Sequence, residues 1–125
     1  VEEFYKFYSL LLGIKPQNAM PFEVNKTLLI KELSTGMRKK VYFNAVLQKP
    51  YTLYIFDEPF SGLDITSVLQ IKKLLKKLSE THIVLFASHI LETLSDCKEI
   101  YLLHEGNAQI FLPSNLNKIE EFLSL

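Results

Sequence analysis

Leu53-Tyr54-Ile55-Phe56-Asp57-Glu58-Pro59 is the stretch that decides the fold. Residues 52–56 are apolar and β-prone without alternation, which is typical of a strand buried on both faces. Two carboxylates follow, and Pro59 ends the strand. Because ligands of open α/β sheets bind at the carboxyl ends of strands, Asp57 and Glu58 are candidates for holding Mg²⁺ and for orienting an attacking water. An acidic turn with no further role is the plain structural alternative.

A second strand and an intervening helix complete a βαβ unit. Residues 83–88 form the second expected strand, and the helix after Asp64 is apolar on one face. This order predicts a right-handed, parallel strand pair. Four lysines lie on the other face of the helix and are interpreted as a solvated surface rather than a membrane or nucleic-acid site: Lys72, Lys73, Lys76 and Lys77.

Helices are also expected before this unit. Apolar spacing predicts one over residues 4–12 that stops at Gly13, and another over residues 34–48 that Pro50 ends. Residues 26–32 fit either a short helix or an extended segment. The aromatic residues of the first helix fit either a core or a docking surface: Phe4, Tyr5, Phe7 and Tyr8.

Three elements are expected after the unit. A helix should follow His89 and run to about residue 96. Residues 100–103 and 108–111 flank a turn-forming Glu105-Gly106-Asn107 segment, which predicts a hairpin. Residues 116–123 have the spacing of an amphipathic closing helix.

The composition is that of a globular domain. The chain has 125 residues, with 14 basic and 14 acidic side chains, so it lacks the basic excess of a general nucleic-acid binder. Its apolar runs are far shorter than the roughly 18 residues that span a bilayer. Cys97 is the single cysteine, which excludes an internal disulfide and favours a cytosolic location.

Three further motifs surround the carboxylates in sequence. Leu33-Ser34-Thr35-Gly36-Met37 opens a helix, where free N–H groups suit a terminal phosphate, although an ordinary Ser N-cap also explains it. Ser61-Gly62-Leu63-Asp64 reads as a turn with an acidic N-cap. His89 follows Ser88 at the end of the second strand, within reach of the same phosphate.

In this order and spacing, the motifs resemble the signature motif, Walker B strand, D-loop and switch histidine of the ATP-binding-cassette (ABC) ATPases. The resemblance covers residues 33–106 and, more loosely, the whole chain. It implies an α/β, P-loop NTPase-like fold that is present here in part. Residues 1–48 would be the helical subdomain and signature helix, and residues 49–125 would be a portion of the RecA-like core with a C-terminal hairpin and helix.

The resemblance also implies roles for single residues. Asp57 would bind Mg²⁺ through water, Glu58 would be the catalytic base, and His89 would contact the γ-phosphate of ATP. Ser61 and Asp64 would belong to the loop that links two active sites. Because members of the family dimerise head to tail, the signature motif would bind the partner's ATP through Ser34, Thr35, Gly36 and Met37.

The implied function is that of an ATP-hydrolysing transporter subunit, peripheral at the cytoplasmic face of the membrane. It would power a transmembrane permease, with no nucleic acid as partner. The Ser-Thr-Gly-Met form, followed by basic residues 38–40, is most similar to export-type transporters. Thr35 departs from the usual glycine, and its Cβ would narrow the approach to phosphate. Met37 departs from the usual glutamine, and the segment between Gly13 and Leu33 is short for a permease-docking subdomain.

The family's phosphate-binding loop, G-x-x-x-x-G-K-[ST], does not occur around any of the four glycines. We therefore expect Val1 to be a cut edge and the chain to be roughly the second half of an ATPase domain, inactive and poorly soluble alone. Two alternatives remain. One is a truncated or degenerate module that serves as a non-catalytic interaction partner, and the other is a non-transport ABC ATPase.

Overall fold

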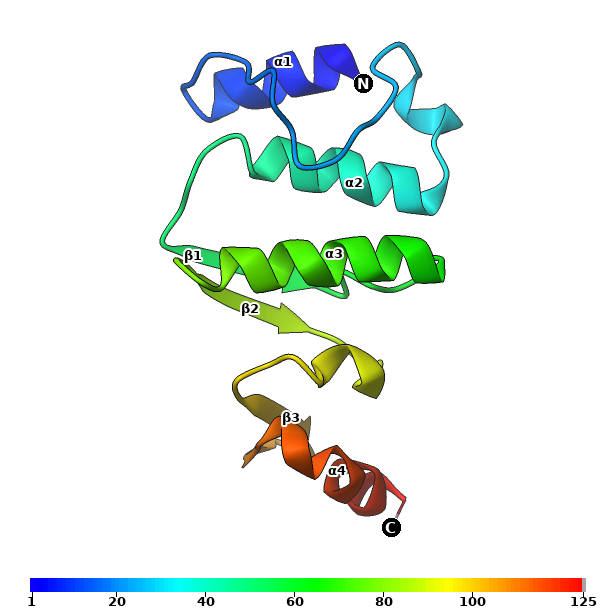
Figure 1. Ribbon diagram of the computed structural model, residues 1–125, viewed down its shortest axis with the longest axis vertical. Helices are drawn as coiled ribbons and strands as arrows, with labels where there is room; N and C mark the ends of the chain where they lie inside the picture. The colour runs from blue at the N-terminus through cyan, green and yellow to red at the C-terminus, as the bar shows by residue number, and fades with distance from the viewer. Residues whose placement is uncertain (125) are drawn as a thin grey trace.

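The computed structural model describes residues 1–124, whose elements follow one another along the long axis of the molecule (Figure 1). The predicted order of helices and strands is confirmed except for the helix expected after His89. The α-helices and strands are α1 (Glu2–Leu11), α2 (Thr35–Val46), β1 (Leu53–Asp57), α3 (Ile65–Leu78), β2 (Ile83–Ala87), β3 (Ile100–His104), β4 (Asn107–Phe111) and α4 (Leu116–Leu123). Three 3-10 turns are η1 (Ile30–Glu32), η2 (Leu91–Leu94) and η3 (Pro113–Asn115).

The β1–α3–β2 unit has the predicted parallel pairing, with Leu53 opposite Ile83 and Asp57 opposite Ala87. Helix α3 packs on one face of the pair (Figure 1), where Phe56 contacts the cluster that contains Ile71. The expectation of burial on both faces is wrong for the described chain. Side chains alternate in a strand, and those on the face away from α3 are exposed: Leu53, Ile55, Ile83 and Leu85.

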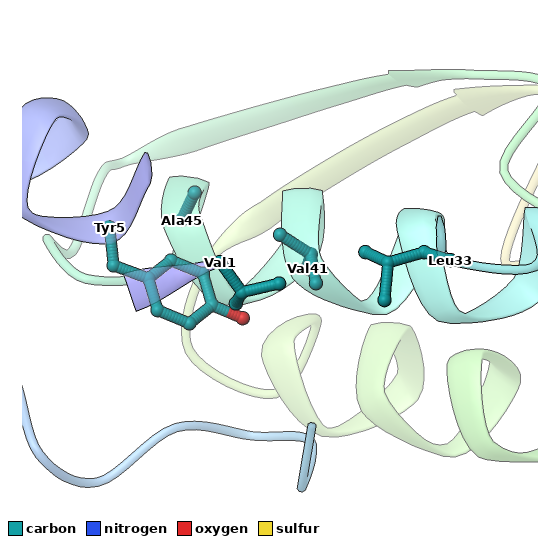
Figure 2. Packing of buried hydrophobic residues seen from close by; sticks show 5 residues of the cluster. All are labelled: Val1, Tyr5, Leu33, Val41 and Ala45. Carbon is teal, nitrogen blue, oxygen red and sulfur yellow. The ribbon is translucent and has the colours of Figure 1, made fainter. Parts of the chain in front are cut away.

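Helix α2 lies between α1 and α3 (Figure 1) and is therefore apolar on two sides. Towards α1, Val41 and Ala45 join a buried cluster whose members Figure 2 shows: Val1, Tyr5, Leu33, Val41 and Ala45. Towards α3, Phe43 packs with Phe60 and Ile71. The aromatic residues of α1 divide accordingly, since Tyr5 is core whereas Phe7 is exposed.

Local hydrogen bonds decide the ends of several elements. Gly13 ends α1 at a φ of +66°, as predicted for a helix stop. The undecided segment 26–32 contains only the η1 turn.

The helix expected from His89 to residue 96 is wrong, because η2 is a single 3-10 turn. Two side-chain hydrogen bonds fix the start of this turn: Ser88 Oγ accepts from Ile90 N, and Thr93 Oγ1 donates to Ile90 O. Such side-chain bonds to the backbone compete with the hydrogen bonds of a longer helix.

The C-terminal hairpin and helix form a third small core. β3 and β4 pair antiparallel around Glu105 and Gly106, whose φ values of 48° and 77° suit a two-residue hairpin turn. Ile100 and Ile119 are buried together, so α4 closes one face of the hairpin. Within residues 1–124 no helix has both the length and the apolar character needed to traverse a bilayer.

Candidate functional site

Glu58 and His89 meet at the carboxyl edge of the parallel pair. The register brings Asp57 beside Ala87, and Glu58 N donates to Ala87 O at 3.0 Å. Each strand therefore delivers its next residues to the same place. The Nδ1 of His89 lies 2.8 Å from Oε2 of Glu58. The structure thus brings together the carboxylate and the imidazole that sequence reasoning placed at this edge.

Glu58 is in an unusual environment for a carboxylate. Its φ is 45°, which is in the left-handed region that non-glycine residues seldom adopt. Its Oε2 atom is buried, yet among described residues it makes no hydrogen bond of proper geometry. The close His89 nitrogen is an ion-pair partner only when the imidazole is protonated. The Glu58 side chain as a whole is 36% exposed, so water can approach it from the solvent side.

Asp57 is exposed at the end of β1, one residue before Glu58. Within residues 1–124, no group of three or more His, Cys, Asp or Glu side chains could form a complete metal cage. Mg²⁺ is usually held by one or two carboxylates together with substrate phosphates. The residues at this edge thus fit a magnesium ion that arrives with a nucleotide better than an autonomous metal site.

The signature-like motif opens α2 through an N-cap. Ser34 has extended backbone angles, and its Oγ accepts from Met37 N at 3.2 Å, as the plain structural alternative requires. Ser34 and Thr35 are exposed, whereas Gly36 and Met37 are half-buried. The first residues of α2 are therefore open to a ligand or partner, and a cap of this kind leaves other N–H groups of the first turn available.

The same motif packs closely against the loop after β1. A Cβ on Gly36 would lie 3.3 Å from Ser67 Oγ, so glycine permits the approach of α2 to α3. Gly62 has a φ of +70°, and a Cβ there would meet Thr35 Cγ2 at 3.5 Å. Two blocks that are separated in sequence, the motif at 33–37 and the loop at 61–64, therefore form one continuous surface.

Asp64 caps α3 from this loop. Its Oδ1 accepts from Ser67 N at 2.6 Å, and this bond lowers the pKa of the Asp64 carboxyl. Ser61 N donates to Glu58 O at 3.3 Å, and Ser61 O accepts from Lys39 Nζ at 2.8 Å. Sequence reasoning missed Lys39. The sequence signal that could have found Lys39 is its position one helical turn after Gly36, which places both residues on the side of α2 that faces α3.

Two hollows of the described surface lie away from this edge. One of about 690 Å³ sits at the start of the strands, where Tyr54, His82 and Lys73 contribute to its lining. A smaller one lies between the hairpin and α4 and includes His104 and Phe122. Neither includes Glu58 or His89. The candidate site at the sheet edge is therefore separate from both of these hollows.

Comparisons with curated proteins give relatives of one kind, although no family model matches the chain. A lipopolysaccharide export system ATP-binding protein of Acidithiobacillus ferridurans is 40% identical over 76 residues, which are 59% of this chain and 32% of the relative. An uncharacterized ABC transporter ATP-binding protein of Methanocaldococcus jannaschii is 31% identical over 121 residues, which are 86% of this chain and 46% of the relative.

Solved structures with the same fold include two ATPase groups. A putative metal-chelate type ABC transporter matches with a TM-score of 0.63 at 19% identity, over 90% of this chain and 43% of that chain. A structure from work on SMC ATPases matches with a TM-score of 0.60 at 19% identity, over 89% of this chain and 70% of that chain. At these identities the structures establish the fold alone.

The fold is therefore the α/β, P-loop NTPase-like fold of ABC ATPases and SMC heads, as the sequence predicted. In sequence the chain is similar to ABC transporter ATP-binding proteins, which confirms the resemblance read from its motifs. It spans between 26% and 46% of the length of the first three relatives.

Proposed function

We propose that this chain is the C-terminal portion of an ATP-hydrolysing subunit of an ABC transporter. The observation that carries the proposal is the 2.8 Å approach of His89 Nδ1 to Glu58 Oε2 at the carboxyl edge of two parallel strands. A carboxylate in this position can act as general base for a water that attacks a phosphoryl group. The ATP-binding relatives support nucleotide as the substrate.

Each residue of the edge then has a defined role. Glu58 accepts the proton of the attacking water, and the partial exposure of its side chain at the sheet edge supports that role. His89 holds the carboxylate from one side and contacts the γ-phosphate with its exposed ring. Asp57 would hold Mg²⁺, which would supply charge neutralisation at the phosphates of ATP.

The motif at the start of α2 serves a second nucleotide. Ser34 and Gly36 would contact ATP held by a partner subunit, with Thr35 and Met37 beside them. The exposure of Ser34 and Thr35 supports contact with another chain. Ser61 and Asp64 would lie at the same subunit interface, because their loop adjoins Thr35. The pairing would be head to tail, so that each ATP lies between two subunits.

The proposed membrane partner is a permease, and the proposed direction is export. The name of one relative, a lipopolysaccharide export system ATP-binding protein, supports export for that relative and suggests it here. The outer side of α1 offers an apolar surface for the permease through Phe7, Leu10 and Leu11, all exposed in the described chain. The subunit would thus act at the cytoplasmic face of the membrane.

The test uses the complete subunit, translated from the reading frame that contains this chain. Its upstream sequence should supply a G-x-x-x-x-G-K-[ST] loop, and the purified subunit should release phosphate from ATP only with Mg²⁺. An upstream sequence without that loop, or phosphate release no faster than in EDTA, would reject the proposal. Stable pairing of such an inactive chain with an intact ATPase subunit would instead support the non-catalytic module.

A further inference from the structure

Lys39 makes two short hydrogen bonds across the molecule. Its Nζ donates to the backbone oxygen of Glu58 at 2.6 Å and to that of Ser61 at 2.8 Å. The side chain comes from α2, whereas both acceptors belong to the turn that follows β1. The ammonium therefore closes the ends of the 58–61 turn onto a different element.

The turn that Lys39 holds has a conformation that needs support. Glu58 has a φ of 45°, a left-handed backbone conformation that is strained for a residue with a Cβ. The Ser61 N–H bond to Glu58 O is long at 3.3 Å, so the turn by itself is weakly closed. Two charge-assisted bonds from one ammonium compensate for both features, because bonds to an ionised donor are stronger than neutral ones.

The partial burial of Lys39 is consistent with a role in supporting the 58–61 turn. Lys39 is half-buried, and its desolvation lowers the pKa of the ammonium, while the nearby Glu58 carboxylate raises it. A lysine that served only solubility would extend into solvent. Here the Lys39 ammonium is partly desolvated. It lies one helical turn after Gly36 and contacts the backbone oxygen of Glu58.

We propose that Lys39 is a positioning residue that sets the direction of the Glu58 carboxylate and links it to the helix that carries Ser34 and Gly36. This inference rests on the proposed ATPase function. Contact of a partner's nucleotide with the start of α2 would be transmitted to the catalytic edge through the Lys39 ammonium. Glu58 would then be correctly aimed only while α2 is in place.

The experiment compares Lys39→Met, Lys39→Arg and Lys49→Met in the complete subunit. Because small misplacements of a catalytic group can cost about 10²-fold, we expect Lys39→Met to lower kcat about 10- to 100-fold, with KM for ATP changed less than about threefold. Lys39→Arg should recover at least part of the rate, since a guanidinium can also donate to two carbonyls. Lys49 is exposed and makes no hydrogen bond within residues 1–124, so Lys49→Met should match the parent.

A double-substitution cycle separates positioning from mere stabilisation. In a Glu58→Gln background, Lys39→Met should change the residual rate of ATP hydrolysis less than about twofold, because the carboxylate that Lys39 positions is already absent. Equal losses in both backgrounds, or a Lys39→Met variant as fast as the parent, would overturn the inference. If Lys39→Met does not fold, Lys39→Gln replaces it under the same criteria.

A second measurement does not need activity. The imidazole NMR signal of His89, assigned by its loss in His89→Ala, should shift in Lys39→Met while the signal of His104 stays unchanged. An unchanged His89 signal would refute the positioning role even if the subunit hydrolyses ATP. A parent subunit without hydrolysis would refute the proposed function, and the NMR result would still decide for or against the Lys39 contact.

Discussion

His89 Nδ1 lies 2.8 Å from Glu58 Oε2, where Glu58 is the first residue after β1 and His89 is the second residue after the adjacent parallel strand β2. Glu58 N also donates to Ala87 O, a bond that fixes the start of the turn. Together these two contacts hold the Glu58 carboxylate in one arrangement at the edge of the sheet. A preorganised base needs little rearrangement in the transition state, which is how such groups contribute to rate.

Glu58→Gln tests this arrangement directly. Glutamine preserves the shape of the side chain but cannot accept a proton from water, so phosphate release by the complete subunit should fall about 10²- to 10⁴-fold. Binding of ATP, measured with a fluorescent analogue, should persist because the edge keeps its geometry. Glu80→Gln, at an exposed site after α3, should leave both quantities unchanged. Retained hydrolysis in Glu58→Gln would show that another group is the base.

The Asp64 cap predicts an acid dependence of stability. The Ser67 N–H bond holds the pKa of Asp64 below its ordinary value. A lowered folded pKa stabilises the fold above the unfolded pKa, about 3.9, and that stabilisation is lost as the pH falls through the lower folded value. Asp64→Asn keeps an oxygen acceptor but has no charge. Its urea midpoint should lie below that of the parent at pH 6, and the difference should narrow as the pH falls below about 3.9. A difference independent of pH would contradict this account.

Sequence patterns predicted the elements because local chemistry dominates them. Gly13 requires a positive φ, Ser34 and Asp64 are strong N-caps, and the Glu105-Gly106 turn fits a tight hairpin. The prediction of a helix after His89 was wrong because the hydrogen bonds of Ser88 and Thr93, which compete with a helix, depend on how these side chains are placed in three dimensions. Local propensity does not reveal them.

The candidate site was predictable in its membership but not in its detail. Spacing placed Glu58 and His89 at one sheet edge, because consecutive parallel strands end together. The positive φ of Glu58 and the bonds of Lys39 depend on the packing of α2 against α3, which a linear pattern does not express. Lysine is also common on exposed helix faces, so the residue type of Lys39 alone does not indicate a contact with the turn after β1.

Asn44 is a buried hydrogen-bond hub that should dominate the stability of the N-terminal half. It is 1% exposed, its Oδ1 accepts from Phe22 N, and its Nδ2 donates to Phe22 O and to the Tyr5 hydroxyl. Asn44→Ala leaves these partners unsatisfied and opens a cavity, so the free energy of unfolding should fall by about 2–4 kcal/mol. Denaturant unfolding of the complete subunit measures it.

The matched control for Asn44 is Asn18→Ala. Asn18 is exposed and makes no hydrogen bond among described residues, so its replacement should change the free energy of unfolding by less than about 0.5 kcal/mol. Similar values for the two variants would mean that the bonds of Asn44 are not formed in solution.

The exposed face of the β1–β2 pair predicts that the isolated 125-residue chain associates with itself. Leu53, Ile55, Ile83 and Leu85 are between 47% and 67% exposed, and they form two directly opposed cross-strand pairs. Such a flat apolar patch on a short, uncovered sheet favours association. Light scattering should therefore detect oligomers, and a hydrophobic dye should bind to them.

Replacing one opposed pair tests whether this face causes the association. Ile55→Lys combined with Leu85→Glu places opposite charges across the strands, which keeps the pair compatible while it removes apolar surface. The monomer fraction of the isolated chain should rise, with its helical circular dichroism retained. Lys49→Glu with Lys98→Glu alters charge away from this face and should leave the oligomers intact. A parent chain that is monomeric at the same concentration would contradict the prediction. In the complete subunit, the same paired change should instead lower stability, because our proposed function requires further chain to cover this face.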